Sequence, residues 1–162
     1  MEIYIRPLKI KDALISYKWR NNFKIWKYTG SKPDIEITPE IEMTWIKNVI
    51  NKEEQKRFAI CISDTEEYIG NVQLTNIKNK KAEFHIFIGE TSFWGKGIGK
   101  KATKLMIDHG FEVLGLEEIY LTVSKLNNKA IKLYQSLGFL CLKSKRESVL
   151  MTLTNPIPEK NN

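Results

Sequence analysis

The sequence lacks the features that would direct a protein into a membrane or an oxidising compartment. None of its apolar runs approaches the roughly 20 residues needed to cross a bilayer. The first ten residues, MEIYIRPLKI, lack the basic and then apolar layout of a secretory signal. The two cysteines, Cys61 and Cys141, each lie inside an apolar run, so we expect buried thiols rather than a disulfide or metal ligands. These absences predict a cytoplasmic protein with no membrane partner.

Several catalytic patterns are absent as well. The sequence shows no Ser-His-Asp or Cys-His arrangement, so a covalent enzyme intermediate is not indicated. It has no P-loop spacing, and we expect no metal centre. No internal repeat or linker interrupts the 162 residues, a length that suits one compact domain spanning residues 1–162.

Positive charge is in excess. The 26 lysines and arginines outnumber the 19 aspartates and glutamates and give a formal net charge of +7. This excess favours anionic ligands such as phosphates. The lysines are spread along the whole chain instead of forming one stripe, so we expect no nucleic-acid partner.

The apolar pattern alternates between strand-like and helical spacing along the chain. The predicted strands cover residues 2–7, 57–63, 68–77, 81–89, 118–124, 139–144 and 147–153. The predicted helices begin near residue 9, at Pro39, near residue 97 and near residue 127. Short polar connections between the strands at 57–89 suit an antiparallel meander. The order predicts an α/β fold, with a mixed sheet of about seven strands flanked by about four helices, and a frayed tail, NPIPEKNN.

A glycine stretch, FWGKGIGKK at residues 93–101, leads into the helix predicted over residues 97–114. Such a turn exposes backbone N–H groups at the positive end of the helix dipole, and glycine lets an anion approach closely. The stretch therefore favours phosphate binding, although a plain tight turn is the alternative. The helical spacing predicts an inward face made of Ile98, Ala102, Leu105, His109 and Val113, with His109 as a core histidine.

Two segments, AEFHIFIGETSFWGKGIGKKATKLMIDHGF and LEEIYLTVSKLNNKAIKLYQSLGF, closely resemble the GNAT superfamily of acyl-CoA-dependent N-acetyltransferases. The family's pyrophosphate loop, Q/R-x-x-G-x-G/A, maps onto residues 94–99, where Trp94 replaces the first polar residue. The second family pattern, N-x-x-A-x-x-L-Y-x-x-x-G-F, is matched without gaps over residues 127–139. The resemblance implies a GNAT fold and acetyl-CoA as co-substrate. It also implies a set of cofactor-binding residues: Phe87, Ile88, Trp94, Gly95, Lys96, Gly97, Ile98, Gly99, Lys100, Asn127 and Tyr134.

Attack of an amine on an acetyl thioester needs one base and one acid, because an alkylammonium loses a proton and the leaving thiolate gains one. The resemblance implies Tyr134 as the acid, although its place on an apolar helix stripe also suits a core aromatic. For the base, Glu83 and His85 share one face of a strand. The resemblance favours Glu83, whereas His85 has the better unperturbed pKa. Alternatively, Glu83 pairs with a nearby lysine and His85 is an ordinary sheet residue.

The amine acceptor is the least determined feature. The resemblance favours an amino sugar or sugar nucleotide, with polyamines and N-terminal peptides of ribosomal proteins as alternatives. Trp19 and Tyr28 are candidates for stacking on such a substrate, although aromatics beside helices also suit a core. Glu83 is a further candidate for binding the substrate. Four acidic residues are candidates for lining a polyamine site, or belong to a solvated helix start: Asp34, Glu36, Glu40 and Glu42. A reading of a different class is a non-catalytic module that binds acyl-CoA or RNA. A homodimer paired through an exposed sheet edge or through the C-terminal strands would suit this fold.

Overall fold

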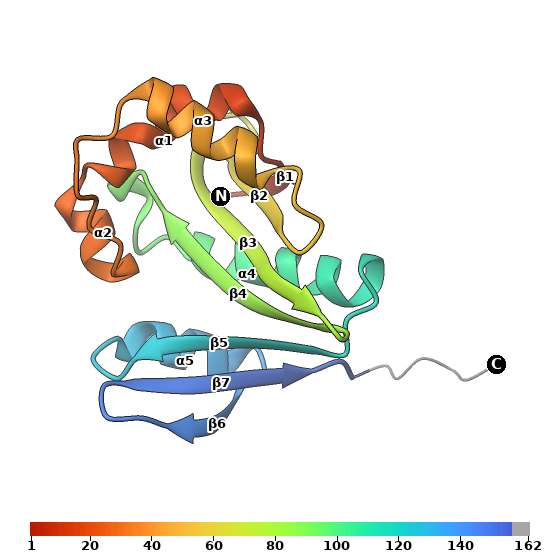
Figure 1. Cartoon of the computed structure of the whole chain (residues 1–162). Helices are drawn as coiled ribbons and strands as arrows, with labels where there is room; N and C mark the ends of the chain where they lie inside the picture. Colours follow the sequence, from red (N-terminus) through yellow and green to blue (C-terminus); the bar gives the residue numbers. More distant parts are fainter. Residues whose placement is uncertain (157–162) are drawn as a thin grey trace.

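A computed structural model describes residues 1–156, apart from the side chain of Tyr28. Its centre is a seven-stranded sheet in the order β1-β2-β3-β4-β5-β7-β6 (Figure 1). Every neighbouring pair is antiparallel except β4 and β5, which are parallel. The strands are β1 (Ile3–Pro7), β2 (Lys56–Ile62), β3 (Tyr68–Lys78), β4 (Lys81–Ile88), β5 (Glu118–Ser124), β6 (Leu140–Ser144) and β7 (Ser148–Thr154). The predicted mixed sheet of seven strands is confirmed.

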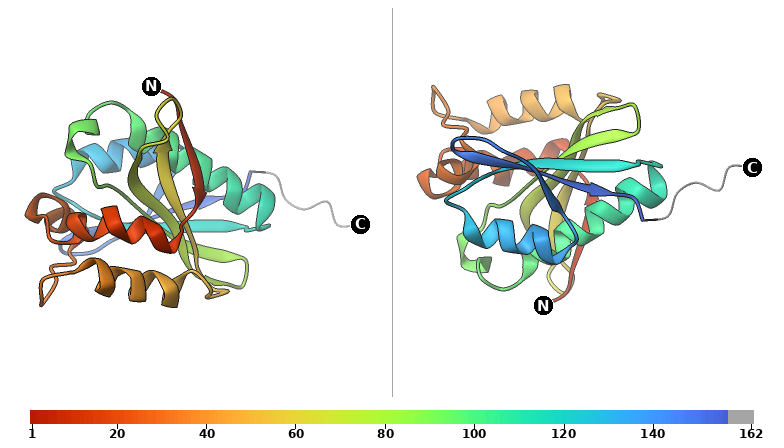
Figure 2. Two further views of the ribbon diagram at one scale, coloured as in Figure 1. Left: turned by 90° about the horizontal axis from the view of Figure 1, so that it is seen from above. Right: turned by 90° about the horizontal axis from the view of Figure 1, so that it is seen from below.

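Helices lie on both faces of the sheet (Figure 2). They are α1 (Ala13–Arg20), α2 (Phe23–Thr29), α3 (Pro39–Val49), α4 (Ile98–Asp108) and α5 (Asn128–Ser136), with short turns at Ile10–Asp12, Thr91–Phe93 and His109–Val113. The described residues form five helices where four were predicted, and α2 is the helix that was not predicted. Its seven residues follow the N-cap Asn22, whose side chain accepts a hydrogen bond from the Lys24 N–H, and precede the C-cap Gly30, which has a φ of 68°. The predicted tail lies mostly outside the described residues.

Two apolar cores flank the sheet. The larger packs α4 and α5 against one face, and the smaller packs α1 and α3 against the other. The predicted inward face of α4 was partly wrong, because Leu105 and Val113 are 38% and 68% exposed. Met106 and Ile107 are buried instead, and the π-helical turn at His109–Val113 changes the spacing beyond them. His109 lies half-buried with its ring 4.8 Å from that of Phe58.

The outer strand β6 is uncovered on both faces. All five of its residues are exposed, including Cys141. The prediction that Cys141 is buried was therefore wrong, since an apolar run at the edge of a sheet has no layer above it; Cys61 on β2 is buried as expected. The predicted homodimer stays a prediction. Among the described residues, no helix is long and apolar enough to cross a membrane.

Candidate active site

The strands β4 and β5 separate toward their C-terminal ends (Figure 1), and we call the region between the separated parts the slot. The two strands pair only from Lys81 with Glu118 to Glu83 with Tyr120, although β4 continues to Ile88 and β5 to Ser124. The Gly89 N–H donates to the Ile69 carbonyl on the β3 side, 2.7 Å away. Because N–H directions alternate along a strand, the Ile88 and Ile86 N–H groups face the slot. These backbone donors are placed to bind an oxygen atom there.

Trp94 is hydrogen-bonded to the C-terminal end of β4, which borders the slot. Its indole N–H donates to the Ile88 carbonyl at 2.9 Å, which ties the start of the glycine stretch to the end of β4. The position departs from the family pattern, in which a glutamine or arginine supplies a polar side chain. The structure shows that Trp94 still makes a polar contact, directed at the backbone.

The glycine stretch forms an open turn at the N-terminus of α4. Gly95 and Gly97 have φ values of 76° and 77°, and a Cβ atom at either position would meet nothing within 4 Å. Glycine is favoured at these positions because their backbone is left-handed, and not because neighbouring atoms leave no room for a side chain. The backbone of the turn is therefore open to a ligand. Gly97 caps α4, whose first N–H groups point out of the helix. This cradle fits the phosphates of acetyl-CoA.

The lysines around the glycine turn differ in how free their ammonium groups are to contact a phosphate. Lys96 lies with its ammonium 5.2 Å from the Phe93 ring, and Lys100 is exposed. Lys101 is held by the Glu2 carboxylate at 3.0 Å and by the Met1 carbonyl at 2.8 Å. Lys96 and Lys100 are thus the better candidates for phosphate contacts.

The second motif brings Asn127 and Tyr134 to the same face as α4. The Asn127 side chain accepts a hydrogen bond from the Ala130 N–H and caps α5, so its amide NH2 group is what it can offer to a cofactor. The Tyr134 ring lies between Phe84 and Phe139, with ring centroids 6.1 and 5.7 Å away. Burial raises the pKa of Tyr134 to about 12, so its hydroxyl keeps its proton at neutral pH. Phe84 belongs to β4, which places Tyr134 beside the strand that borders the slot.

Glu83 and His85 come together on the opposite face of β4. The His85 Nε2 atom lies 3.4 Å from Glu83 Oε1, and the Asn76 amide donates to Glu83 Oε2 at 2.9 Å. Burial lowers the pKa of His85 and nearby Arg57 lowers it further, whereas the Glu83 carboxylate raises it. The net direction is downward, so the imidazole is neutral at physiological pH. Sequence reasoning missed Asn76, because it reaches Glu83 only through the pairing of β3 with β4, where the register shifts after Thr75.

Trp19 does not offer a stacking surface. Its side chain is 3% exposed, packs 4.7 Å from the Tyr68 ring, and donates its indole N–H to Glu90 at 2.8 Å. A Cβ atom at Gly89 would lie 2.0 Å from the Trp19 ring. The prediction that Trp19 binds substrate by stacking is therefore corrected: the ring is a core element that fixes the end of β4. The side chain of Tyr28 lies outside the described part of the chain.

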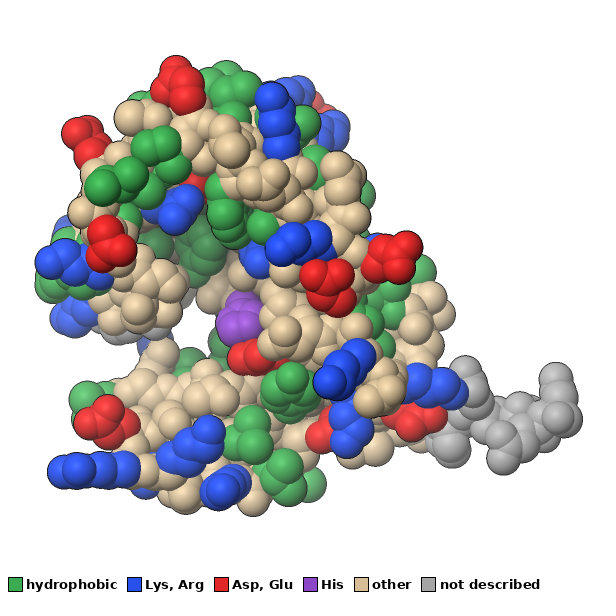
Figure 3. All heavy atoms as spheres, viewed as in Figure 1, with side chains coloured by type: hydrophobic (Ala, Val, Ile, Leu, Met, Phe, Trp, Pro, Cys, Tyr) green, Lys and Arg blue, Asp and Glu red, His purple; other side chains and the backbone are tan. Residues whose placement is uncertain are grey.

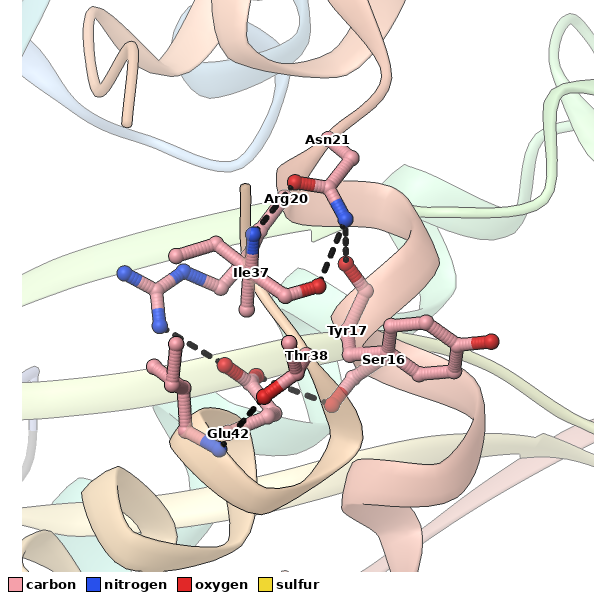
Figure 4. Close-up of polar contacts among 8 residues, drawn as sticks. Ser16, Tyr17, Arg20, Asn21, Ile37, Thr38 and Glu42 are labelled. Atoms are coloured by element: carbon pink, nitrogen blue, oxygen red, sulfur yellow. Dashed lines mark hydrogen bonds and ion pairs between the residues drawn. The ribbon is translucent and has the colours of Figure 1, made fainter. Parts of the chain in front are cut away.

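The acidic residues proposed to line a polyamine site are not equivalent. Asp34, Glu36 and Glu40 are exposed, but Glu42 is 2% exposed. Glu42 accepts a hydrogen bond from Ser16 at 2.9 Å and pairs with Arg20 at 2.7 Å (Figure 4). Its charge is already balanced within the fold, so the prediction that Glu42 lines an acidic site was wrong.

The space-filling view shows a hollow between the α1–α3 layer and the β5–β7–β6 part of the sheet (Figure 3). Histidine, acidic and basic side chains meet at its wall. Within residues 1–156, no group of three or more histidine, cysteine, aspartate or glutamate side chains could hold a metal ion. The titratable side chains that the structure places on the two faces of β4 are Tyr134 on one side and Glu83 with His85 on the other.

Comparisons with known proteins agree with this geometry. A family profile described as the Acetyltransferase (GNAT) domain matches residues 2–140. The spermidine N(1)-acetyltransferase of Escherichia coli K12 is 31% identical over 137 residues, which are 85% of this chain and 72% of that protein. The acetyltransferase PseH of Campylobacter jejuni is 28% identical over 132 residues, 82% of this chain and 79% of its own length. Among solved structures, the spermidine N-acetyltransferase of Vibrio cholerae in complex with CoA and spermine superposes with a TM-score of 0.84 and 25% identity, covering 94% of this chain and 95% of the other.

Proposed function

The chain belongs to the GNAT acetyltransferase family and uses acetyl-CoA as its co-substrate, and from this premise we propose that it acetylates a primary amine of an amino sugar or sugar nucleotide. The observation that carries the proposal is the placement of acid and base around the slot. Tyr134 reaches β4 from the α4–α5 face, and His85 with Glu83 lies on the α1–α3 face. An amine and a thioester that meet in the slot would therefore find a base on one side and an acid on the other.

Each side chain has a defined task in this proposal. Bound acetyl-CoA supplies an activated thioester, and the chain's own residues position it and move protons. Neutral His85 takes the proton of the acceptor ammonium, while Glu83, held by Asn76, orients the imidazole. The Ile86 and Ile88 N–H groups donate to the oxygen on which charge develops. Tyr134 gives its proton to the departing sulfur, since its raised pKa keeps the hydroxyl protonated.

A polyamine is the second candidate acceptor. It is favoured by the similarity to the spermidine acetyltransferases of Escherichia coli and Vibrio cholerae. Against it, three carboxylates of β4, its C-terminal end and α3 are engaged within the fold: Glu42 by Arg20, Glu83 by Asn76 and His85, and Glu90 by Trp19. A polycation would have to bind the exposed Asp34, Glu36 and Glu40 instead, which lie before α3 and in its first turn and not beside His85.

The test of function is acetyl-CoA-dependent thiol release by the purified protein. The acceptor panel contains amino sugars, nucleotide-linked amino sugars, spermidine, spermine and N-terminal peptides of ribosomal proteins. We expect saturable turnover with the amino sugars. Turnover with spermidine alone would replace the proposed acceptor, and no turnover despite confirmed CoA binding would favour the non-catalytic module.

The pH dependence separates the two candidate bases. Because the pKa of His85 is lowered from 6.5, kcat/KM is expected to stay high at neutral pH and to fall only as the pH drops through that lowered value. His85→Gln should lower kcat about 100-fold and remove this acid limb. Glu83→Gln removes the carboxylate that raises the His85 pKa, so the limb should move to lower pH with a much smaller rate loss. Loss of the limb in Glu83→Gln, with His85→Gln nearly unaffected, would make Glu83 the base.

A further inference from the structure

Arg57 lies in the same cross-strand row as the proposed base. Residue Arg57 of β2 is paired with Gln73 of β3, and Gln73 is paired with His85 of β4. Partners in such a row project from the same face of the sheet. Adjacent strands are about 4.8 Å apart, so the Arg57 and His85 backbones are about 10 Å apart. A small molecule whose amine lies at His85 therefore reaches Arg57 with its other end.

Most N–H donors of the Arg57 guanidinium make no hydrogen bond within the described part of the chain. Its Nε–H donates to the Gln55 side-chain oxygen at 2.9 Å, and the guanidinium lies 4.9 Å from the Trp45 ring centroid. Within residues 1–156 no carboxylate pairs with it, and its four Nη–H groups have no hydrogen-bond acceptor. A half-buried positive charge without an opposite charge is costly, and a neutral amide and an aromatic face compensate it only in part.

Two other arginines of the same layer show the contrast. Arg6 makes two hydrogen bonds of 2.8 Å to Asp12, and Arg20 pairs with Glu42 at 2.7 Å. The Asp12 carboxylate raises the pKa of Arg6, whereas burial alone lowers the pKa of Arg57. The fold thus supplies carboxylates to its structural arginines and leaves Arg57 without one.

We propose that Arg57 is the specificity residue of the acceptor site and binds an oxyanion, either phosphate or carboxylate, carried by the acceptor amine. The proposal rests on the acetyltransferase function proposed above and narrows its acceptor. A planar guanidinium already stacked on Trp45 presents a fixed pair of donors, which matches a phosphate or carboxylate bidentately. The same charge disfavours protonated groups nearby, so it promotes loss of the acceptor's ammonium proton and repels the further charges of a polyamine.

The test compares acceptors that share an amino sugar but differ in charge: glucosamine, glucosamine 6-phosphate, an aminouronic acid and a nucleoside-diphosphate-linked amino sugar. For the native protein we expect kcat/KM about 10- to 100-fold higher for an anionic acceptor than for glucosamine, the range of a charge-assisted hydrogen bond. In Arg57→Gln this preference should vanish through a higher KM for the anionic acceptors. With glucosamine the acid limb of the rate should move to higher pH, because the charge of Arg57 lowers the pKa of His85. Comparing the phosphate and carboxylate acceptors identifies which oxyanion Arg57 binds.

Lys56→Gln is the matched control. Lys56 precedes Arg57 on β2, so its side chain points to the opposite face, where it acts on the pKa of His109. The Lys56→Gln substitution removes the same charge from the neighbouring position, and this variant should keep the full preference for anionic acceptors. Arg57→Lys keeps the charge without the planar fork and should retain part of the preference. The proposal is overturned if Lys56→Gln reduces the preference for anionic acceptors as much as Arg57→Gln does. It is also overturned if spermidine is turned over better than every anionic sugar.

A binding measurement separates this proposal from the proposed function. If no amine is turned over, calorimetry with glucosamine 6-phosphate and CoA present still tests the site. Binding by the native protein that is lost in Arg57→Gln and kept in Lys56→Gln supports the oxyanion site even without catalysis. Equal binding by all three proteins overturns it.

Discussion

Tyr134→Phe is expected to lower kcat about 100-fold or more while leaving the dissociation constant for CoA nearly unchanged. The substitution removes one hydroxyl and keeps the ring between Phe84 and Phe139, so the packing of α5 against β4 is preserved. Without the hydroxyl, the thiolate must depart without a proton from the enzyme, a loss typical of a missing general acid. Steady-state kinetics and calorimetric titration with CoA measure the two quantities separately.

Tyr4→Phe is the matched control for this experiment. Tyr4 lies on β1, three strands away from β4 in the sheet. The Tyr4→Phe substitution also removes one tyrosine hydroxyl. Its kcat should equal that of the native protein. A Tyr134→Phe variant with unchanged kcat would remove Tyr134 from the mechanism, and one that loses CoA binding would make the hydroxyl a cofactor contact instead of an acid.

The glycine turn and the capped helix of the candidate cofactor site were predictable from the sequence because their determinants are local. Gly95 and Gly97 set the turn through their own backbone angles, and Asn127 caps the helix that carries Tyr134 seven residues later. Contiguous motifs of this kind need no knowledge of distant contacts.

The acceptor side depends on partners far apart in the chain. Trp19 is fixed by Gly89 and Glu90, about 70 residues later, which is why its burial could not be read from the segment around it. Arg57 is joined to His85 only through the register of three strands. The spacing of apolar residues also failed to predict two local features. The sequence of the short helix α2 resembles that of a loop. Cys141 lies in an apolar run but is exposed, because it belongs to the outermost strand of the sheet.

Glu42→Ala is expected to lower the free energy of unfolding by about 3 kcal/mol. The substitution leaves the buried Ser16 hydroxyl without its acceptor and leaves Arg20 without its counter-charge. Breaking a buried pair by removing one partner costs about 3–5 kcal/mol, and we expect the lower end because the Arg20 side chain is 37% exposed and can be hydrated. For a protein of this size the melting temperature should fall by about 6–12 °C, measurable by circular dichroism.

Glu40→Ala gives the control on the same helix, since Glu40 is exposed in the first turn of α3 and should cost less than about 1 kcal/mol. The pair of variants also bears on the acceptor. A carboxylate that bound a polyamine would change the KM for spermidine and leave the melting temperature nearly constant. The structure predicts the reverse for Glu42, because its charge is balanced by Arg20 and its oxygens are already bonded. A stable Glu42→Ala protein with an altered KM for spermidine would return this carboxylate to the substrate site and weaken the argument for an anionic acceptor.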